Sequence, residues 1–153
     1  MTMGAHMVAL GKAVADLVVV AGPVESVHDG TMGDIEVMPD LRGHVGLGPL
    51  AGIEAALASG RAKRWLVLPC DMPHLTTALV TALRDHPTNG AVVLQGAGPL
   101  PLRIDSTLLT TVTAAIDAGA LAVRHLQCVR AAAEVPVPNP ALIQDVDSPA
   151  DLR

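Results

Sequence analysis

Residues 66–73 read Leu-Val-Leu-Pro-Cys-Asp-Met-Pro, and this segment decides the fold class. Its apolar start is typical of a strand buried on both faces, as in a parallel sheet. The prolines after it end the strand, so Asp71 follows where the strand runs out. In open α/β sheets, ligands bind outside the carboxyl ends of the strands. The segment therefore predicts an α/β domain with a carboxylate at the ligand-binding edge of its sheet.

The rest of the chain alternates between short apolar runs, often rich in β-branched residues, and segments with helical spacing. Such alternation implies right-handed crossovers and a three-layer α/β/α sandwich with a mostly parallel sheet. Pro49 suits a first helical turn, and Thr76 and Thr77 are candidate caps of the helix after Asp71. We expect strands over 17–21, 35–38, 65–68, 91–95, 99–104, 133–137 and 142–146, helices over 8–16, 49–60, 75–83, 106–118 and 120–130, and a last turn at 148–149.

Composition narrows the class of protein. The 153 residues contain no dividing linker and form one expected domain, 1–153, from which we exclude residues 1–7 because Gly4–Met7 is typical of a cloning remnant. A net charge of −5 with 10 basic residues argues against nucleic-acid binding. Two distant cysteines argue against a disulfide framework, and no apolar run suits a membrane helix or a signal peptide. We therefore expect a cytoplasmic protein.

Asp71 is the first candidate site residue. Mg²⁺ takes one or two carboxylates from a protein, and its remaining ligands are phosphate oxygens and water. One aspartate at the end of a strand can supply such a ligand and so position nucleotide phosphates. The alternative is that Asp71 caps the helix that follows it. The glycine-containing segment upstream favours the metal ligand.

That upstream segment, Gly48–Gly52, opens the helix expected over 49–60. The N–H groups at a helix amino end attract anions, and glycines permit close approach of a ligand. The same glycines equally suit close packing of a helix on a sheet. Asp40, in the loop before this segment, is placed to accept hydrogen bonds from a base or ribose, or to lie in solvent. Both alternatives stay open on the residues alone.

Asp145 and Asp147 alternate across Val146 near the carboxyl end of the chain. On a strand, this spacing places both carboxylates on one face. Two like charges at close range are unfavourable unless a cation or hydrogen-bond donors lie between them. A splayed pair in solvent is the alternative, with Asp147 starting the last turn. The six histidines show no zinc-binding spacing.

Taken together, the segments 48–53 (Gly-Pro-Leu-Ala-Gly-Ile), 68–73 and 145–152 resemble the molybdenum cofactor guanylyltransferase family. The resemblance implies a cytoplasmic nucleotidyltransferase with a fold like that of the nucleotide-diphospho-sugar transferases. It implies transfer of GMP from GTP to molybdopterin, with release of pyrophosphate and a need for magnesium. Its partners would be GTP and molybdopterin, with self-association or contact with other molybdenum cofactor proteins, and neither nucleic acid nor membrane.

The resemblance also assigns roles to individual residues. Asp71 matches the catalytic metal ligand, and Asp40 matches a loop aspartate that contacts the nucleotide. The residues that line the guanosine pocket match Gly48, Pro49, Leu50 and Gly52. The resemblance places Asp145 and Asp147 on the side of the site that binds the pterin substrate. The family has asparagine at these two positions, so the carboxylates are a departure from the family pattern.

A larger departure lies at the amino end. The family opens with a strand, a glycine-rich loop and a lysine that hold the triphosphate. Too few residues precede the strand at 17–21 to supply them, so we align 8–16 with the helix after that loop. This predicts a sheet open at its centre, with unpaired edges.

Three alternatives remain for the chain: a truncated enzyme, a non-catalytic nucleotide-binding relative acting as a partner, or a fold that takes the strand from another chain. A CTP-using nucleotidyltransferase is a further alternative.

Overall fold

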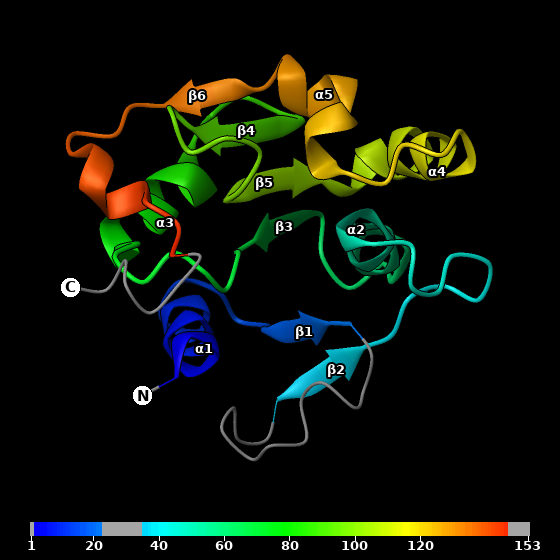
Figure 1. Ribbon diagram of the computed structural model, residues 1–153, viewed down its shortest axis with the longest axis horizontal. Coiled ribbons are helices and arrows are strands. Elements are labelled where there is room, and N and C mark those ends of the chain that lie inside the picture. The colour runs from blue at the N-terminus through cyan, green and yellow to red at the C-terminus, as the bar shows by residue number, and fades with distance from the viewer. Residues whose placement is uncertain (1, 23–34, 147–153) are drawn as a thin grey trace.

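The computed structural model describes residues 2–22 and 35–146, so the predicted site residue Asp147 and the turn at 148–149 lie outside the described residues. Figure 1 shows the arrangement of the elements. The helices are α1 (Met3–Val14), α2 (Pro49–Ala58), α3 (Thr77–Asp85), α4 (Leu109–Asp117) and α5 (Gln127–Arg130). The strands are β1 (Val19–Ala21), β2 (Glu36–Met38), β3 (Arg64–Val67), β4 (Ala91–Leu94), β5 (Leu102–Asp105) and β6 (Ala133–Val135). Short 3₁₀ helices span Ser106–Leu108, Val123–His125 and Pro140–Ile143.

The described strands form two sheets. β1 and β2 pair in parallel, with Val20 opposite Val37. The second sheet has the order β3-β5-β4-β6, in which β4 and β6 are parallel. β5 lies between β3 and β4 and runs antiparallel to both. The α/β class is as predicted, but β5 makes the sheet mixed, because an antiparallel strand can enter from a short connection without a crossover helix.

Helices cover both faces of the four-stranded sheet. Because successive strand residues point to opposite faces, β4 divides its side chains between two cores. Val93 packs in one apolar cluster with residues of α2, α4 and α5. Val92 and Leu94 pack in the other cluster, with residues of α1 and α3. The result is the predicted three-layer α/β/α sandwich, with α1 and α3 on one side of the sheet.

Threonine side chains cap the amino ends of α1 and α3. The Thr2 side chain accepts a hydrogen bond from the Ala5 N–H, so α1 starts at Met3. Met7 is buried in the core, and residues 3–7 therefore belong to the fold, contrary to the expected exclusion of 1–7. At α3, the Thr76 side chain accepts from the Leu79 N–H at 3.3 Å, which confirms Thr76 as the cap.

The predicted elements near the carboxyl end differ most from the structure. The helix expected over 120–130 is broken into a 3₁₀ turn and the single turn α5, because Leu126 between them is extended. The strand expected over 142–146 is wrong. Pro140 starts a 3₁₀ turn, and the Asn139 side chain caps it by accepting from the Ala141 N–H. Such local hydrogen bonds from asparagine compete with strand pairing.

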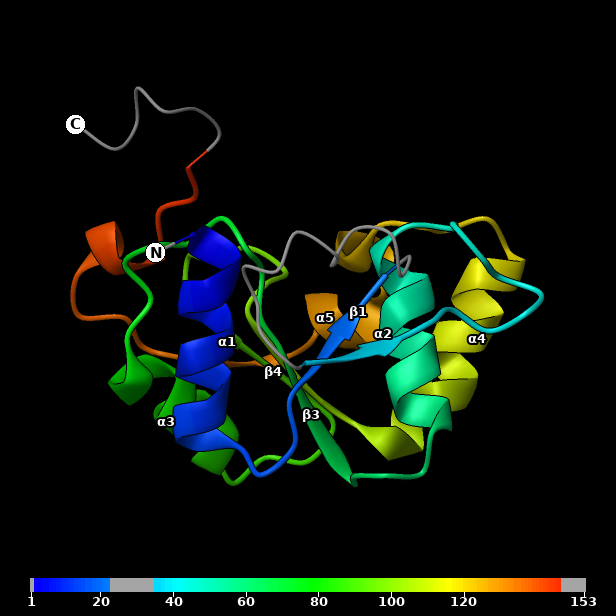
Figure 2. The same ribbon diagram turned by 90° about the horizontal axis from the view of Figure 1, so that it is seen from below.

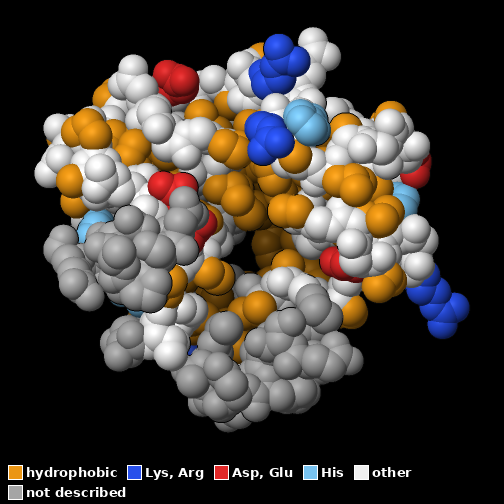
Figure 3. Space-filling model, in the orientation of Figure 1, with side chains coloured by type: hydrophobic (Ala, Val, Ile, Leu, Met, Phe, Trp, Pro, Cys, Tyr) orange, Lys and Arg blue, Asp and Glu red, His pale blue; other side chains and the backbone are white. Residues whose placement is uncertain are grey.

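The two sheets do not meet at their facing edges. β1 pairs only with β2, and β3 pairs only with β5, within the described residues. A cavity of about 750 Å³ separates β1 from β3, and its walls include Val18, Val19 and Leu66. Figure 3 shows a central hollow surrounded largely by hydrophobic side chains. The sheet is therefore open at its centre, as the sequence predicted.

Candidate functional site

The candidate site lies where β1 and β3 end. Both strands run toward the upper side of the molecule in Figure 2. The amino ends of α1 and α2 and the connection from β3 to α3 lie on the same side. Ligands bind at this edge of open α/β sheets because helix amino ends and the segments that follow the strands converge there.

Asp71 lies in the segment between β3 and α3 and is half-buried. Within the described residues, its carboxylate has neither a hydrogen-bond donor nor a basic partner. Since Thr76 caps α3, Asp71 does not perform the capping role that was its alternative. As far as the described residues go, the carboxylate is thus available to a cation or to the donors of a ligand.

The carboxyl-terminal segment returns to Asp71. The Val146 N–H donates to the Asp71 carbonyl oxygen at 2.8 Å, and Val146 is buried. Its neighbour Asp145 is exposed. The fold therefore brings two of the predicted site residues close together, although a long stretch of sequence separates them. Their partner in the predicted set, Asp147, lies outside the described residues.

This arrangement suits magnesium better than a metal held by the protein alone. The described residues contain no group of three or more His, Cys, Asp or Glu side chains that could hold a metal ion. Mg²⁺ needs only one or two carboxylates when substrate phosphates and water complete its ligands. The carboxylate of Asp71, which has no partner in ranges 2–22 and 35–146, and the neighbouring segment of Asp145 fit that donor set.

The predicted nucleotide segment divides into exposed and buried residues. Gly48 adopts a φ of 80°, a left-handed conformation that favours glycine, and both it and Pro49 are accessible at the surface. Leu50 is fully buried in the core. A Cβ atom on Gly52 would lie 2.8 Å from the Ala21 Cβ, so Gly52 allows α2 to pack closely on β1. Gly48 and Pro49 are the residues of this segment that a ligand can reach.

A second, shallower pocket opens beside Gly48 and Pro49. Its volume is about 400 Å³, within the range of small-molecule sites. Apolar side chains form most of its wall, and Arg124 supplies a positive charge. The lining residues are Gly48, Pro49, Pro99, Leu100, Leu121, Ala122, Val123 and Arg124. The sequence did not indicate residues 121–124, because their approach to Gly48 is a tertiary contact without a local pattern.

The loop that carries Asp40 is closed by its own hydrogen bond. The Asp40 Oδ2 atom accepts from the Gly46 N–H at 2.9 Å, so one carboxylate oxygen orders the loop before Gly48. This hydrogen bond is exposed, so both alternatives for Asp40, contact with a nucleotide or a solvated loop carboxylate, stay open. Asp40 lies outside both pockets.

A histidine anchors the same loop to two helices. The His44 Nδ1 atom lies 2.6 Å from the Glu54 carboxylate on α2, and its Nε2 atom lies 3.0 Å from Asp117 on α4. Glu54 is 1% exposed and also accepts from the Thr113 hydroxyl at 2.7 Å. The hydrogen bond to Glu54 raises the pKa of His44, against the smaller opposing effect of desolvation. No sequence motif marked His44, because its partners are distant along the chain.

Cys70 beside Asp71 is not an activated nucleophile. Desolvation, and secondarily the charge of Asp71, raise the pKa of the Cys70 thiol. The thiol is therefore protonated near neutral pH and is a poor nucleophile.

None of the helices that the structure describes has the length and apolar character needed to span a bilayer.

Sequence comparisons identify relatives of one kind. The family model of the MobA-like NTP transferase domain matches residues 1–136. A molybdenum cofactor guanylyltransferase of Shewanella frigidimarina is 38% identical over 79 residues, which cover 48% of this chain and 40% of that protein. One from Pseudomonas syringae is 44% identical over 59 residues, which cover 36% of this chain and 29% of that protein. The chain thus matches less than half the length of these curated relatives.

Solved structures share the fold at low sequence identity. A protein of Aquifex aeolicus superposes with a TM-score of 0.78 and 16% identity, over 95% of this chain and 79% of that one. The 2-C-methyl-D-erythritol 4-phosphate cytidylyltransferase of Thermus thermophilus superposes with a TM-score of 0.71 and 18% identity, over 99% of this chain and 85% of that one. These likenesses confirm the nucleotidyltransferase-like fold.

Proposed function

Because the chain belongs to the MobA-like NTP transferase family, we propose that it transfers GMP from GTP to the phosphate of molybdopterin in the cytoplasm. In this reaction a molybdopterin phosphate oxygen bonds to the α-phosphorus of GTP. The bond from that phosphorus to the bridging oxygen breaks, and pyrophosphate leaves. The observation that carries the proposal is the carboxylate of Asp71, unpaired among the described residues and set where β3 ends.

Asp71 would hold a magnesium ion, and Asp145, whose neighbour Val146 donates to the Asp71 carbonyl oxygen, would bind one of its waters or add a ligand. When bound, the ion supplies neutralisation of the charge that develops on the phosphates. Transfer of a nucleotidyl group requires mainly that the phosphates be held in line, so the protein contributes position and charge rather than a covalent intermediate. This is consistent with the protonated thiol of Cys70.

Gly48 and Pro49 would contact the guanosine. They border the 400 Å³ pocket at the amino end of α2. Their neighbours hold α2 in place, Leu50 by its burial in the core and Gly52 by its close contact with Ala21 of β1. One Asp40 carboxylate oxygen accepts from the Gly46 N–H, and the other would accept a hydrogen bond from the nucleotide. Arg124 on the wall of the same pocket would balance the charge of the nucleotide.

Thermal unfolding with GTP or CTP, each with and without Mg²⁺, tests this proposal. A ligand at 100 times its Kd stabilises the folded state by about 2.7 kcal/mol. We expect a magnesium-dependent rise in Tm with GTP, and its loss in Asp71→Asn. Glu134→Gln, an exposed carboxylate on the opposite edge strand β6, is the matched control and should keep the full rise.

Product formation separates an enzyme from a protein that only binds nucleotide. Pyrophosphate release from GTP should require both molybdopterin and Mg²⁺ and should be lost in Asp71→Asn. A rise in Tm with CTP but not with GTP would contradict the choice of base. Stabilisation by GTP that persists unchanged in Asp71→Asn would contradict the assignment of the metal ligand.

A further inference from the structure

We propose that His44 is a positioning residue for nucleotide binding: it bridges Glu54 of α2 and Asp117 of α4, and so holds in place the two walls of the pocket beside Gly48. This inference depends on the proposed function and adds to it a residue that binds no substrate atom itself. Three observations carry it, which are the path of the loop before α2, the burial of Glu54 and the place of Asp117 at the end of α4.

The first observation is the path of the loop, residues 39–48, that joins β2 to α2. Figure 2 shows this loop reaching across to α4 before it returns to the start of α2. Inside the loop, the His44 N–H donates to the Leu41 carbonyl at 2.8 Å, and the His44 carbonyl accepts from the Leu47 N–H at 3.2 Å. His44 therefore lies in a hydrogen-bonded turn, so the contacts of its side chain fix the backbone that leads into Gly48.

The second observation is the burial of Glu54. This residue is 1% exposed, and its carboxylate accepts from the Thr113 hydroxyl at 2.7 Å and lies 2.6 Å from the His44 Nδ1 atom. A buried ion pair adds little stability relative to apolar side chains of the same volume, because both charges lose their hydration. Removing its cation, however, leaves an uncompensated buried charge. The pair therefore ties the loop to one place on α2.

The third observation is the position of Asp117, the last residue of α4. The partial charge at the carboxyl end of a helix is negative, so a carboxylate there is favourable beside a cation. The His44 Nε2 atom lies 3.0 Å from Asp117. Shortly after Asp117 the chain reaches Leu121, whose carbonyl oxygen lies 3.5 Å from where a Cβ atom on Gly48 would stand. His44 thus connects the loop and α2 to residues 121–124, which form the opposite wall of the pocket.

The charge of the imidazole sets the strength of this bridge. Protonated His44 donates from both ring nitrogens, whereas the neutral ring donates from one. The hydrogen bond to Glu54 raises the pKa of His44, desolvation opposes this rise, and Asp117 adds to it. The charged residues of its own loop are Asp40, which closes the loop, and Arg42, which is exposed. The bridge is therefore complete at low pH, and one of its two contacts is weakened as the pH rises through the raised pKa.

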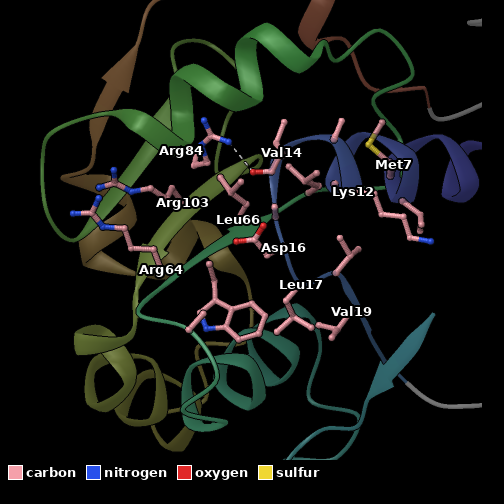
Figure 4. A pocket seen from close by; sticks show the side chains of 18 of the residues that line it. Met7, Lys12, Val14, Asp16, Leu17, Val19, Arg64, Leu66, Arg84 and Arg103 are labelled. Atoms are coloured by element: carbon pink, nitrogen blue, oxygen red, sulfur yellow. Dashed lines mark hydrogen bonds between the residues drawn. The ribbon is translucent and has the colours of Figure 1, made fainter. Parts of the chain in front are cut away.

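The larger cavity between β1 and β3 is a poor alternative place for guanosine. Figure 4 shows the apolar side chains of Leu17, Val19 and Leu66 at its walls. The arginines at one end of it already have acceptors in the protein. Arg84, for example, donates to the Val14 carbonyl at 2.8 Å, the dashed line in Figure 4. A base and a ribose buried there would lack hydrogen-bond partners, which favours the pocket whose walls His44 connects.

Calorimetric titration with GTP and Mg²⁺ tests the inference at about pH 6 and about pH 9, on either side of the usual range for histidine. The variants are His44→Gln, which cannot be protonated, and His44→Lys, which keeps a positive charge. Asp117→Ala cuts only the contact to α4, and since Asp117 is exposed, this variant keeps the test available if His44→Gln does not fold. The control is His86→Gln at the carboxyl end of α3, where the ring accepts a local hydrogen bond from the Thr88 N–H.

We expect His44→Gln to raise the Kd of GTP on the order of 10-fold at low pH, the usual size of a coupling between neighbouring sites. The ratio of its Kd to that of the parent should fall as the pH rises, because the parent then loses the charged form of His44. His44→Lys should stay near the parent at low pH and show no such fall. Asp117→Ala should raise the Kd by a smaller factor, and His86→Gln should not change it.

Hydrogen exchange of the nucleotide-free protein measures the anchor directly. The Gly46 N–H donates to Asp40 and the Leu47 N–H donates to the His44 carbonyl, so both amides report on the loop. Their exchange should become faster in His44→Gln and stay unchanged in the control variant.

Three results would overturn the inference. The first is a His44→Gln variant with a lower Tm but the Kd of the parent at low pH, which would reduce His44 to a role in stability. The second is a His44→Lys variant that binds as weakly as His44→Gln at both pH values, which would exclude the charge as the cause. The third is unchanged exchange at Gly46 and Leu47 in His44→Gln. Because exchange needs no nucleotide, it decides on the anchor separately, whereas a parent that does not bind GTP would refute the proposed function.

Discussion

Glycine-to-alanine substitution should have opposite effects at two helical positions of this protein. Gly11 in α1 and Gly52 in α2 both lie inside helices, and neither has a positive φ. Alanine stabilises a helix interior by about 1 kcal/mol relative to glycine. A Cβ on Gly11 would lie 3.4 Å from the methyl groups of Val18, which is ordinary contact. Gly11→Ala should therefore stabilise the protein by about 1 kcal/mol.

At Gly52 the new methyl group meets an obstacle that cannot rotate away. Its Cβ would lie 2.8 Å from the Cβ of Ala21, which is fixed to the backbone of β1. Overpacking of a tight contact costs about 1–3 kcal/mol, and the cost here lies in the upper half because strand and helix must move apart. After the gain in helix propensity of about 1 kcal/mol, a net destabilisation of about 1–2 kcal/mol remains.

Urea denaturation of the two variants and the parent measures both effects, provided that the m-value is unchanged. The expected separation between the variants is about 2–3 kcal/mol in the free energy of unfolding. If Gly52→Ala were as stable as Gly11→Ala, the close contact of α2 with β1 would be refuted. Gly52 would then have to be explained by a ligand instead of by packing.

Two further predictions concern the neighbouring elements. His44 contacts Glu54 and Asp117, and these contacts raise its pKa. The protonated imidazole therefore stabilises the fold fully below its ordinary pKa of 6.5, and this stabilisation is lost as the pH rises through the raised pKa. His44→Gln should remove this pH dependence of the free energy of unfolding, measured by urea denaturation at several pH values. Thr76→Ala removes the cap of α3 and should lower the free energy of unfolding by about 1 kcal/mol. The control Thr77→Ala, at an exposed position, should change stability little. Circular dichroism during thermal unfolding measures both variants, and equal losses of stability would contradict the role of Thr76 as the cap.

Local sequence patterns predicted the parts of the site that depend on neighbours along the chain. The apolar run before Asp71 and the prolines around it were sufficient to place a carboxylate after a strand. The predicted burial of that strand on both faces is wrong, because Arg64 is exposed and Leu66 and Val67 are only half-buried. Pro49 and Thr76 marked the starts of α2 and α3, because the geometry of a first helical turn is a local property. The resemblance at 48–53 and 68–73 predicted the family that the comparison over residues 1–136 confirms.

Local patterns failed where several weak preferences compete. The segment 142–146 has strand-like composition, but Asn139 and Pro140 start a 3₁₀ turn before it. The helix expected over 120–130 has helical composition, but the extended conformation of Leu126 divides it. In both places a side-chain cap or a change at one residue outweighs a periodicity that is only a few residues long.

The sequence by itself determined which segments become most of the helices and strands, and that Asp71 follows a strand. Only the tertiary structure decided that β5 enters antiparallel between β3 and β4, that Val146 returns to Asp71, and that His44 joins Glu54 to Asp117. Periodicity and capping act within a few residues, so they can be read along the chain. The choice of strand neighbours and buried polar partners depends on competition among distant segments for the same edges and the same core, which is settled only when the chain packs.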